Sequence, residues 1–226
     1  MSVTLTMNRT ISPVVAILFF ALFACVPLAR AQTNISAYAA GGTATDSSVG
    51  PIDTLGAGTT YPGPSMGGFF KTYGADVVFY HNFGVGAEYS TRVGKGSYAG
   101  LLYDPIFMDG NVVYRPHWRG GRVNPEFQAG YGRADLKLFY TPQICYKLPQ
   151  GCSAVNGEVI SVSDSEFHFS AGLRFKLYRG VFLRPQFDMR HVPNDFSTYF
   201  GSSWIPQYSV AIGYSFDWGK WLGGSK

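Results

Sequence analysis

A histidine and a serine two positions apart are the best candidates for catalysis in this chain. Residues 168–170 read His-Phe-Ser, and Glu166 is a nearby acid. A histidine in such a pair can remove the proton of the serine hydroxyl, so that the serine oxygen attacks an acyl ester. A second histidine lies in 191–193, which read His-Val-Pro, and proline supplies no nucleophile. The first segment could therefore perform acyl transfer if both of its side chains reached a substrate.

Two cysteines predict a disulfide rather than a metal site. Cys145 and Cys152 enclose a short loop, and no histidine lies near enough in the sequence to complete a zinc site. A disulfide persists in an oxidising compartment, and the N-terminal segment indicates export to one. We therefore expect a bond between Cys145 and Cys152.

Other chemical motifs are missing from the sequence. It contains no phosphate-binding glycine loop, no HExxH zinc motif and no nucleophile elbow. Asp46, Asp53 and Asp104 do not have the spacing of a calcium loop. No run of basic residues indicates nucleic-acid binding. We expect no cofactor, no bound metal and no nucleic-acid partner.

Residues 1–31 have the features of a cleaved signal peptide. Arg9 precedes an apolar stretch from Val14 to Leu28, and residues 29–31 read Ala-Arg-Ala, a small-x-small cleavage site. Met1 or Met7 could be the start. An alternative is lipidation of Cys25, which follows Leu-Phe-Ala. The formal net charge of +4 falls to +2 when Arg9 and Arg30 are removed. Residues 32–226 are expected to form one domain.

The mature chain alternates between apolar and polar residues at every second position. In 167–177 the odd positions are aromatic or aliphatic and the even positions are His, Ser, Gly, Arg and Lys. A strand separates these two sets onto opposite faces, whereas a helix would mix them. Similar runs predict eight strands, near 34–40, 73–79, 85–92, 106–116, 123–136, 167–177, 181–190 and 207–218.

The connections between these runs alternate in length. Short turns are expected near residues 81, 119 and 179. Long connections are expected at about 41–67, 94–104, 140–163 and 193–205. Short periplasmic turns and long extracellular loops are typical of outer-membrane barrels. We therefore predict an all-β fold, a closed antiparallel eight-stranded transmembrane barrel.

The apolar face is expected to meet lipid and the charged face to fill the lumen. An Arg or Lys facing lipid at the midplane would cost about 2–4 kcal/mol. Aromatic residues near strand ends (Tyr73, Tyr89, Tyr114, Trp118, Tyr208, Trp218) fit the two interfacial girdles. An eight-stranded barrel is just filled by side chains, so a wide pore is not expected. The predicted lumen charges form a structural network or, alternatively, line an ion path: Asp76, Glu88, Arg92, Asp109, Arg115, Glu126, Arg174, Lys176, Arg184, Asp188 and Arg190.

These features resemble those of small outer-membrane barrels such as the transmembrane domain of outer-membrane protein A. The most specific part is the end, where Gly213, Phe216 and Trp218 have the Gly-x-x-aromatic-x-aromatic spacing of a C-terminal assembly signal. The resemblance implies recognition by the barrel assembly machinery and residence among outer-membrane lipids. Residues 219–226 extend beyond the point where the family often ends.

The resemblance leaves the role open between three functions. The favoured one is a non-enzymatic barrel with an envelope-structural or surface-interaction role through its long loops, whose extracellular partner is unknown. The second is a narrow, porin-like channel for small solutes. The third is an enzyme similar to lipid A deacylases, which carry a His-x-Ser pair on a strand. Against the third, the alternation turns His168 and Ser170 toward the lumen, away from lipid, so no catalytic residue is assigned.

Overall fold

A computed structural model describes most of the chain beyond the predicted signal peptide. The predicted signal peptide, Cys25, the Cys145–Cys152 disulfide, Trp118 and Trp218 lie outside the described residues and stay predictions. Within the described part of the chain, no helix is long and apolar enough to cross a membrane. The described residues are 33–45, 51–52, 58, 61–62, 65–98, 100–116, 121–141, 157–192 and 204–217.

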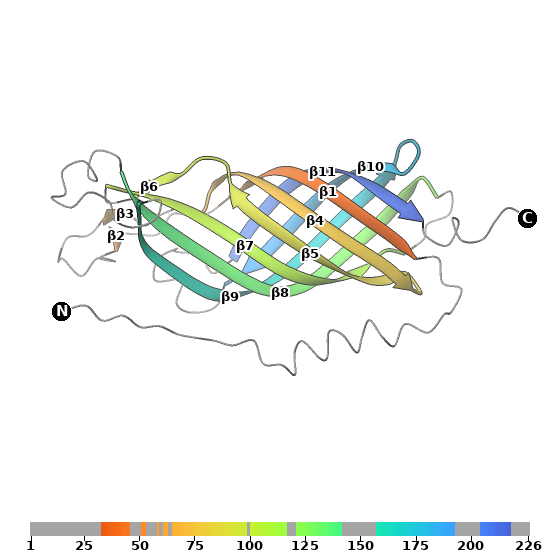
Figure 1. Cartoon of the computed structure of the whole chain (residues 1–226), viewed down its shortest axis with the longest axis horizontal. Helices are drawn as coiled ribbons and strands as arrows, with labels where there is room; N and C mark the ends of the chain where they lie inside the picture. The colour runs from red at the N-terminus through yellow and green to blue at the C-terminus, as the bar shows by residue number, and fades with distance from the viewer. Residues whose placement is uncertain are drawn as a thin grey trace, which may run out of the picture. The chain divides into compact units, whose positions relative to one another are not determined.

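Eight long strands form a closed antiparallel barrel (Figure 1). Each strand pairs with the next one along the chain, and the first pairs with the last from Asn34↔Asp217 to Ala44↔Gln207, which closes the sheet. This confirms the predicted fold. The eight strands are β1 (Asn34–Ala44), β4 (Gly68–Tyr80), β5 (Phe83–Arg92), β7 (Leu101–Tyr114), β8 (Val123–Tyr140), β9 (Glu158–Lys176), β10 (Val181–His191) and β11 (Trp204–Asp217).

Two predicted turns are tight hairpins at the end of the barrel that carries the short connections. His81 and Asn82 join β4 to β5 with φ of 42° and 72°. Arg179 and Gly180 join β9 to β10 with φ of 48° and 90°. Two consecutive residues with positive φ are typical of the type I′ turn, whose twist matches that of paired strands. Because the turns hold the hairpin register, they determine which side chains enter the lumen.

Two of the predicted long connections are partly strand. The expected loop at 94–104 contains β6 (Gly96–Tyr98), which pairs with the start of β7. The expected loop at 140–163 contains the first residues of β9, which begins at Glu158. A further two-stranded pair, β2 (Pro51–Ile52) and β3 (Tyr61–Pro62), lies within the first connection. The strands at this end are therefore longer than the alternation of apolar residues indicates.

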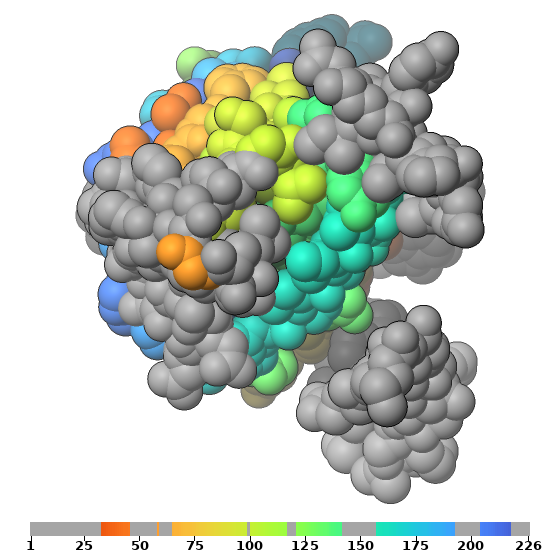
Figure 2. Space-filling model, turned by 90° about the vertical axis from the view of Figure 1, so that its left-hand side faces the viewer, coloured from red at the N-terminus to blue at the C-terminus, as the bar shows by residue number. Residues whose placement is uncertain are grey.

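The longest strands continue past the lipid-facing zone on the side of the long connections. On β9 the outward positions are serine from 161 to 165 and become Phe at 167 and 169. On β8 the outward residue Tyr131 is followed by Arg133 and, four positions later, Lys137. We call residues 133–140 and 158–165 the β8–β9 extension. At about 3.3 Å per residue it measures roughly 25 Å along the strands. Seen from this end, β7, β8 and β9 lie side by side on the surface (Figure 2).

Candidate functional site

The outer wall of the barrel is apolar and exposed. Large side chains at every second strand position face outward, including Phe127, Tyr131, Phe167, Phe169, Val210 and Ile212. Ile212, for example, is 59 % exposed, although a water-soluble protein would bury most such residues. His191 is also on this face, with its ring stacked on Trp204 at 4.3 Å between centroids. This surface is suited to hydrocarbon with aromatic residues at the strand ends.

The half of the lumen next to the short turns is filled by an ion-pair cluster that we call the inner cluster. It comprises Asp76, Arg115, Glu126, Arg174 and Arg184, all buried. Arg115 lies 2.7 Å from both Asp76 Oδ1 and Glu126 Oε2. Arg174 lies 3.1 Å from Asp76 Oδ2 and 2.9 Å from Glu126 Oε2, and Arg184 pairs with Glu126 Oε1. Three guanidiniums thus share two carboxylates, with Glu126 in contact with all three.

A second group of charges lies farther from the short turns than the inner cluster does, and we call it the middle cluster. Its members are Glu88, Asp109, Glu166, His168, Asp188 and Arg190. Arg190 Nη1 lies 2.7 Å from Asp109 Oδ2 and 2.9 Å from Glu166 Oε1. Its Nη2 lies 3.7 Å from Glu88 Oε2. Four carboxylates therefore surround one guanidinium and one imidazole.

His168 lies at the centre of the middle cluster. Its Nδ1 is 2.9 Å from Asp109 Oδ1 and 3.0 Å from Asn111 Oδ1. Its Nε2 is 3.2 Å from Asp188 Oδ1 and 3.9 Å from Glu88 Oε2. The ring is fully buried, so all of its polar neighbours are protein groups of the lumen wall.

Tyr38 connects the two clusters. Its hydroxyl donates to Glu88 Oε1 at 2.5 Å, and the guanidinium of Arg184 lies 4.0 Å above its ring. Arg184 also lies 3.5 Å from Glu88 Oε1. Gly74, which pairs with Tyr38 in the sheet, makes room for the Tyr38 ring, because a Cβ at Gly74 would lie 2.3 Å from the ring carbon Cζ. Charge–ring stacking and hydrogen bonding thus link the two clusters into one packed interior.

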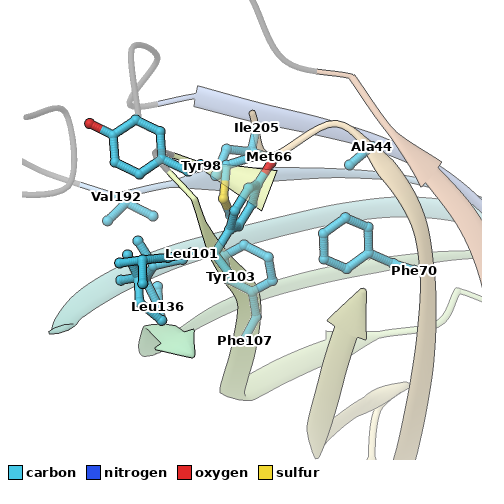
Figure 3. Packing of buried hydrophobic residues seen from close by; sticks show 12 residues of the cluster. Ala44, Met66, Phe70, Tyr98, Leu101, Tyr103, Phe107, Leu136, Val192 and Ile205 are labelled. Carbon is cyan, nitrogen blue, oxygen red and sulfur yellow. The ribbon is translucent and has the colours of Figure 1, made fainter. Parts of the chain in front are cut away.

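The end of the lumen beside the long connections is closed by apolar side chains, which we call the apolar plug (Figure 3). Phe70 and Phe107 lie at its base, with ring centroids 5.9 Å apart. Arg190 lies 4.8 Å from the ring of Phe107, where the plug meets the middle cluster. The buried members are Ala44, Met66, Phe70, Tyr98, Leu101, Tyr103, Phe107, Ala134, Leu136, Leu138, Val192 and Ile205. The described lumen is therefore filled at three levels.

Replacing Gly130 by alanine tests how tightly the lumen is packed. A Cβ at Gly130 would lie 1.9 Å from Asn111 Oδ1, so the Asn111 side chain that faces His168 must move. Such overpacking typically costs about 1–3 kcal/mol. We expect G130A to lower the urea midpoint of unfolding in vesicles. Gly110→Ala is the matched control, because nothing lies within 4 Å of its Cβ. Equal midpoints for the two variants would contradict the packing described above.

Most of the predicted lumen charges lie in these clusters, but two do not. Lys176 has the inward parity, yet it is exposed because β9 ends there, one residue before the turn to β10. The prediction that it belongs to the network is wrong. Arg92 is half-buried beside the plug, where it donates to Tyr103 Oη at 3.0 Å and to the Ser65 carbonyl at 3.3 Å. It is thus separate from the two ion-pair clusters.

Sequence reasoning left several lumen residues out of the network. The predicted strand begins at residue 167, so the alternation does not include Glu166, the acid expected beside His168. Glu166 shares the parity of His168, and that parity places it in the lumen. Tyr38 and Asn111 are neutral, so a pattern of charges does not identify them. The predicted assembly signal stays a prediction, with Gly213 and Phe216 in β11.

The His168–Ser170 pair does not have the geometry of an acyl-transfer site. Both side chains face the lumen and both are buried. Within the described strands, the His168 ring contacts Asp109, Asn111 and Asp188, and no hydrogen bond joins it to Ser170. A base must lie within hydrogen-bond reach of its nucleophile, and lipid must reach both.

Comparison with solved structures identifies the fold. The crystal structure of Neisserial surface protein A (NspA) aligns with a TM-score of 0.52 and 11% sequence identity, covering 81% of this chain and 97% of that one. OprG from Pseudomonas aeruginosa aligns with a TM-score of 0.48 and 13% identity over 82% and 96% of the two chains. Ail of Yersinia pestis, in complex with the heparin analogue sucrose octasulfate, gives 0.45 and 13% over 82% and 99%. No protein-family model and no curated protein sequence matches the chain.

The closed barrel, its apolar outer wall and its similarity to NspA define the class. The chain has the fold of a small eight-stranded outer-membrane β-barrel. Its fold is that of the outer-membrane protein A-like barrels. At 11% identity the similarity to NspA concerns the fold alone.

Proposed function

We propose that this protein is a non-conducting, non-enzymatic barrel that acts through its extracellular surface, in envelope structure or in surface interaction. The filled lumen is the observation that carries this proposal. Ions would have to displace the apolar plug and then separate both ion-pair clusters. Separating the clusters leaves buried charges unpaired, which typically costs several kcal/mol. The expected partners are outer-membrane lipid and, during insertion, the barrel assembly machinery.

The β8–β9 extension supports a surface role. Its outward side chains form a fixed polar surface: Arg133 lies 2.5 Å from Asp135 Oδ1 and donates to Ser163 Oγ at 2.7 Å. Lys95 also lies 3.3 Å from the centroid of the Phe139 ring. Such ordered polar structure beyond the apolar band of the wall is not needed to anchor a barrel. A rigid surface that projects from the membrane is suited to contact with another molecule, because little order is lost on binding.

Conductance in planar lipid bilayers tests the proposal. We expect the refolded protein to give no stepwise current at physiological salt, since the plug and the clusters block the lumen. An open porin added to the same chamber is the positive control. Discrete, reproducible steps from the folded barrel would instead support the channel function. A quiet membrane with a barrel shown to be inserted by protease protection would support the proposal.

A separate assay addresses the enzymatic alternative. Purified lipid A is incubated with the folded barrel, and released fatty acid is measured by mass spectrometry. We expect none above a boiled control, because the described His–Ser pair faces the lumen. Release that is lost in His168→Asn and Ser170→Ala would overturn the non-enzymatic assignment.

A further inference from the structure

The charges buried in the lumen do not balance. On the lumen side of the described strands, six carboxylates and four guanidiniums are each at most 6 % exposed, while the buried Asp135 has the outward parity and pairs with Arg133. This leaves an excess of two negative charges before His168 is considered. The carboxylates are Asp76, Glu88, Asp109, Glu126, Glu166 and Asp188, and the guanidiniums are Arg115, Arg174, Arg184 and Arg190.

The excess lies in the middle cluster. The inner cluster has one more guanidinium than carboxylates, whereas the middle cluster has four carboxylates and the single guanidinium of Arg190. Arg184 of the inner cluster contacts Glu88 only at 3.5 Å. A protonated His168 would still leave one charge uncompensated in the lumen. An uncompensated charge away from water is unfavourable enough to require a bound cation or a proton.

Two carboxylate oxygens in the middle cluster have no hydrogen-bond partner among the described residues. They are Glu88 Oε2 and Glu166 Oε2. The Glu88 side chain is 1% exposed, and its Oε2 faces His168 Nε2 at 3.9 Å and Arg190 Nη2 at 3.7 Å. Both distances are too long for a hydrogen bond. A buried oxygen without a donor requires an explanation, and an ion is one of the possible ones.

The neighbours of His168 determine which ring nitrogen carries a proton. The Asn111 amide nitrogen donates to Asp109 Oδ1 at 2.6 Å, so the Asn111 oxygen faces the ring. Nδ1 therefore lies between two acceptors, Asp109 Oδ1 and Asn111 Oδ1, and must be a donor. Nε2 faces the acceptors Asp188 Oδ1 and Glu88 Oε2. The same criterion makes Nε2 a donor as well, unless a cation lies between Nε2 and these oxygens and takes its lone pair.

We propose that the middle cluster binds one divalent transition-metal cation through His168 Nε2, Glu88 Oε2 and Asp188 Oδ1. Ligand atoms about 2.0–2.2 Å from a zinc-type ion lie roughly 3–3.5 Å apart, close to the 3.2 and 3.9 Å separations from Nε2. The overlapping set Glu88, Asp109 and His168, which shares two of these three ligands, has one ligand atom from each residue within 4.8 Å of the others. An imidazole with carboxylates favours zinc or a similar ion over calcium and magnesium, which prefer oxygen alone.

The surroundings fit such a site. Asp109 accepts from His168 Nδ1, the arrangement by which a carboxylate orients a metal-bound imidazole. A divalent ion with a neutral His168 balances the excess of two negative charges. The ligands come from β5, β9 and β10, so no sequence spacing reveals them. The plug and the inner cluster enclose the site, and the ion therefore enters while the barrel closes.

Metal content of the refolded barrel tests the proposal. The full chain is refolded from metal-free urea into detergent with Zn²⁺ or Co²⁺, freed of unbound metal by gel filtration, and analysed by plasma mass spectrometry. The folded fraction is counted from the compact band on unheated gels. We expect about one metal ion per folded barrel, slow exchange with a chelator, and Co²⁺ absorption bands of a nitrogen- and oxygen-bound ion.

Variants separate specific binding from association with any acidic group. We expect His168→Asn and Asp188→Asn to lower the metal content of the folded fraction at least tenfold. Glu166→Gln, which removes a lumen carboxylate that is not a ligand, and the surface variant Glu158→Gln should keep it. Folded wild-type barrel with less than a tenth of an ion, refolded with either metal, would overturn the site. Undiminished metal in folded His168→Asn would do so as well. If the folded wild-type barrel holds no metal, protons neutralise the excess charge instead.

Discussion

Replacing Glu126 by glutamine is expected to lower the free energy of unfolding by about 3–5 kcal/mol, the typical effect of removing one partner from a buried ion pair. Glu126 contacts Arg115 at 2.7 Å, Arg174 at 2.9 Å and Arg184. The Glu126 side chain is 1% exposed, so water cannot solvate the three guanidiniums in place of the lost carboxylate. Arg115 and Arg174 would then share the single carboxylate of Asp76, and Arg184 would keep only Glu88 at 3.5 Å.

Urea titration of the barrel in lipid vesicles, followed by tryptophan fluorescence, measures this change. Glu158→Gln is the matched control. Glu158 lies 3.8 Å from Lys137, and both side chains are 35% exposed. An exposed pair of this kind contributes about 0–1 kcal/mol. If E126Q and E158Q shifted the midpoint equally, the inner cluster would not stabilise the fold as described.

The second large effect concerns the outer wall. Ile212 lies on β11 between the outward residues Tyr208 and Tyr214 and pairs with Ala39 and Leu183. Arginine at this depth would face hydrocarbon, which costs about 2–4 kcal/mol at the midplane. We expect Ile212→Arg to lower the free energy of unfolding by that amount in vesicles.

Ser161→Arg is the control for the position of the arginine relative to the membrane. Ser161 faces outward on β9, but in the β8–β9 extension, beyond the lipid-facing residues that begin at Phe167. Arginine there remains in water or near the interface, where the cost is about 0–1 kcal/mol. Similar losses in Ile212→Arg and Ser161→Arg would mean that the membrane boundary lies elsewhere on the wall.

Alternation in the sequence was sufficient to predict the barrel and its two faces. This worked because lipid on one side and a crowded lumen on the other impose opposite requirements at successive residues. In 167–177 every odd residue is apolar, and the structure places Phe167 and Phe169 outside and His168 and Arg174 inside. The ion pairs could be expected as a group, but their partners could not, because partners such as Arg174 and Asp76 are 98 residues apart.

The alternation that predicts the barrel does not predict the β8–β9 extension. Once a strand leaves the lipid, both of its faces can be polar, so Ser161, Ser163 and Ser165 carry no alternating signal. The three-residue strand β6 is too short to show a period. The apolar plug draws on six strands and on the residues beside them, such as Met66 and Val192, and only the folded arrangement brings these together.

The stacking of an apolar plug on charged clusters gives the two ends of one lumen opposite responses to temperature. Burial of apolar surface stabilises less as a protein is cooled. The cost of burying charges falls on heating, because hydration of charged groups becomes less favourable. The end with the apolar plug, where Phe70, Phe107 and Leu136 lie, therefore loosens first in the cold. The end with the inner cluster, where Glu126 contacts three arginines, is relatively strengthened by heat. Cooling therefore favours opening at the plug while the inner cluster stays closed. Heating changes the balance in the opposite direction and favours the closed inner cluster.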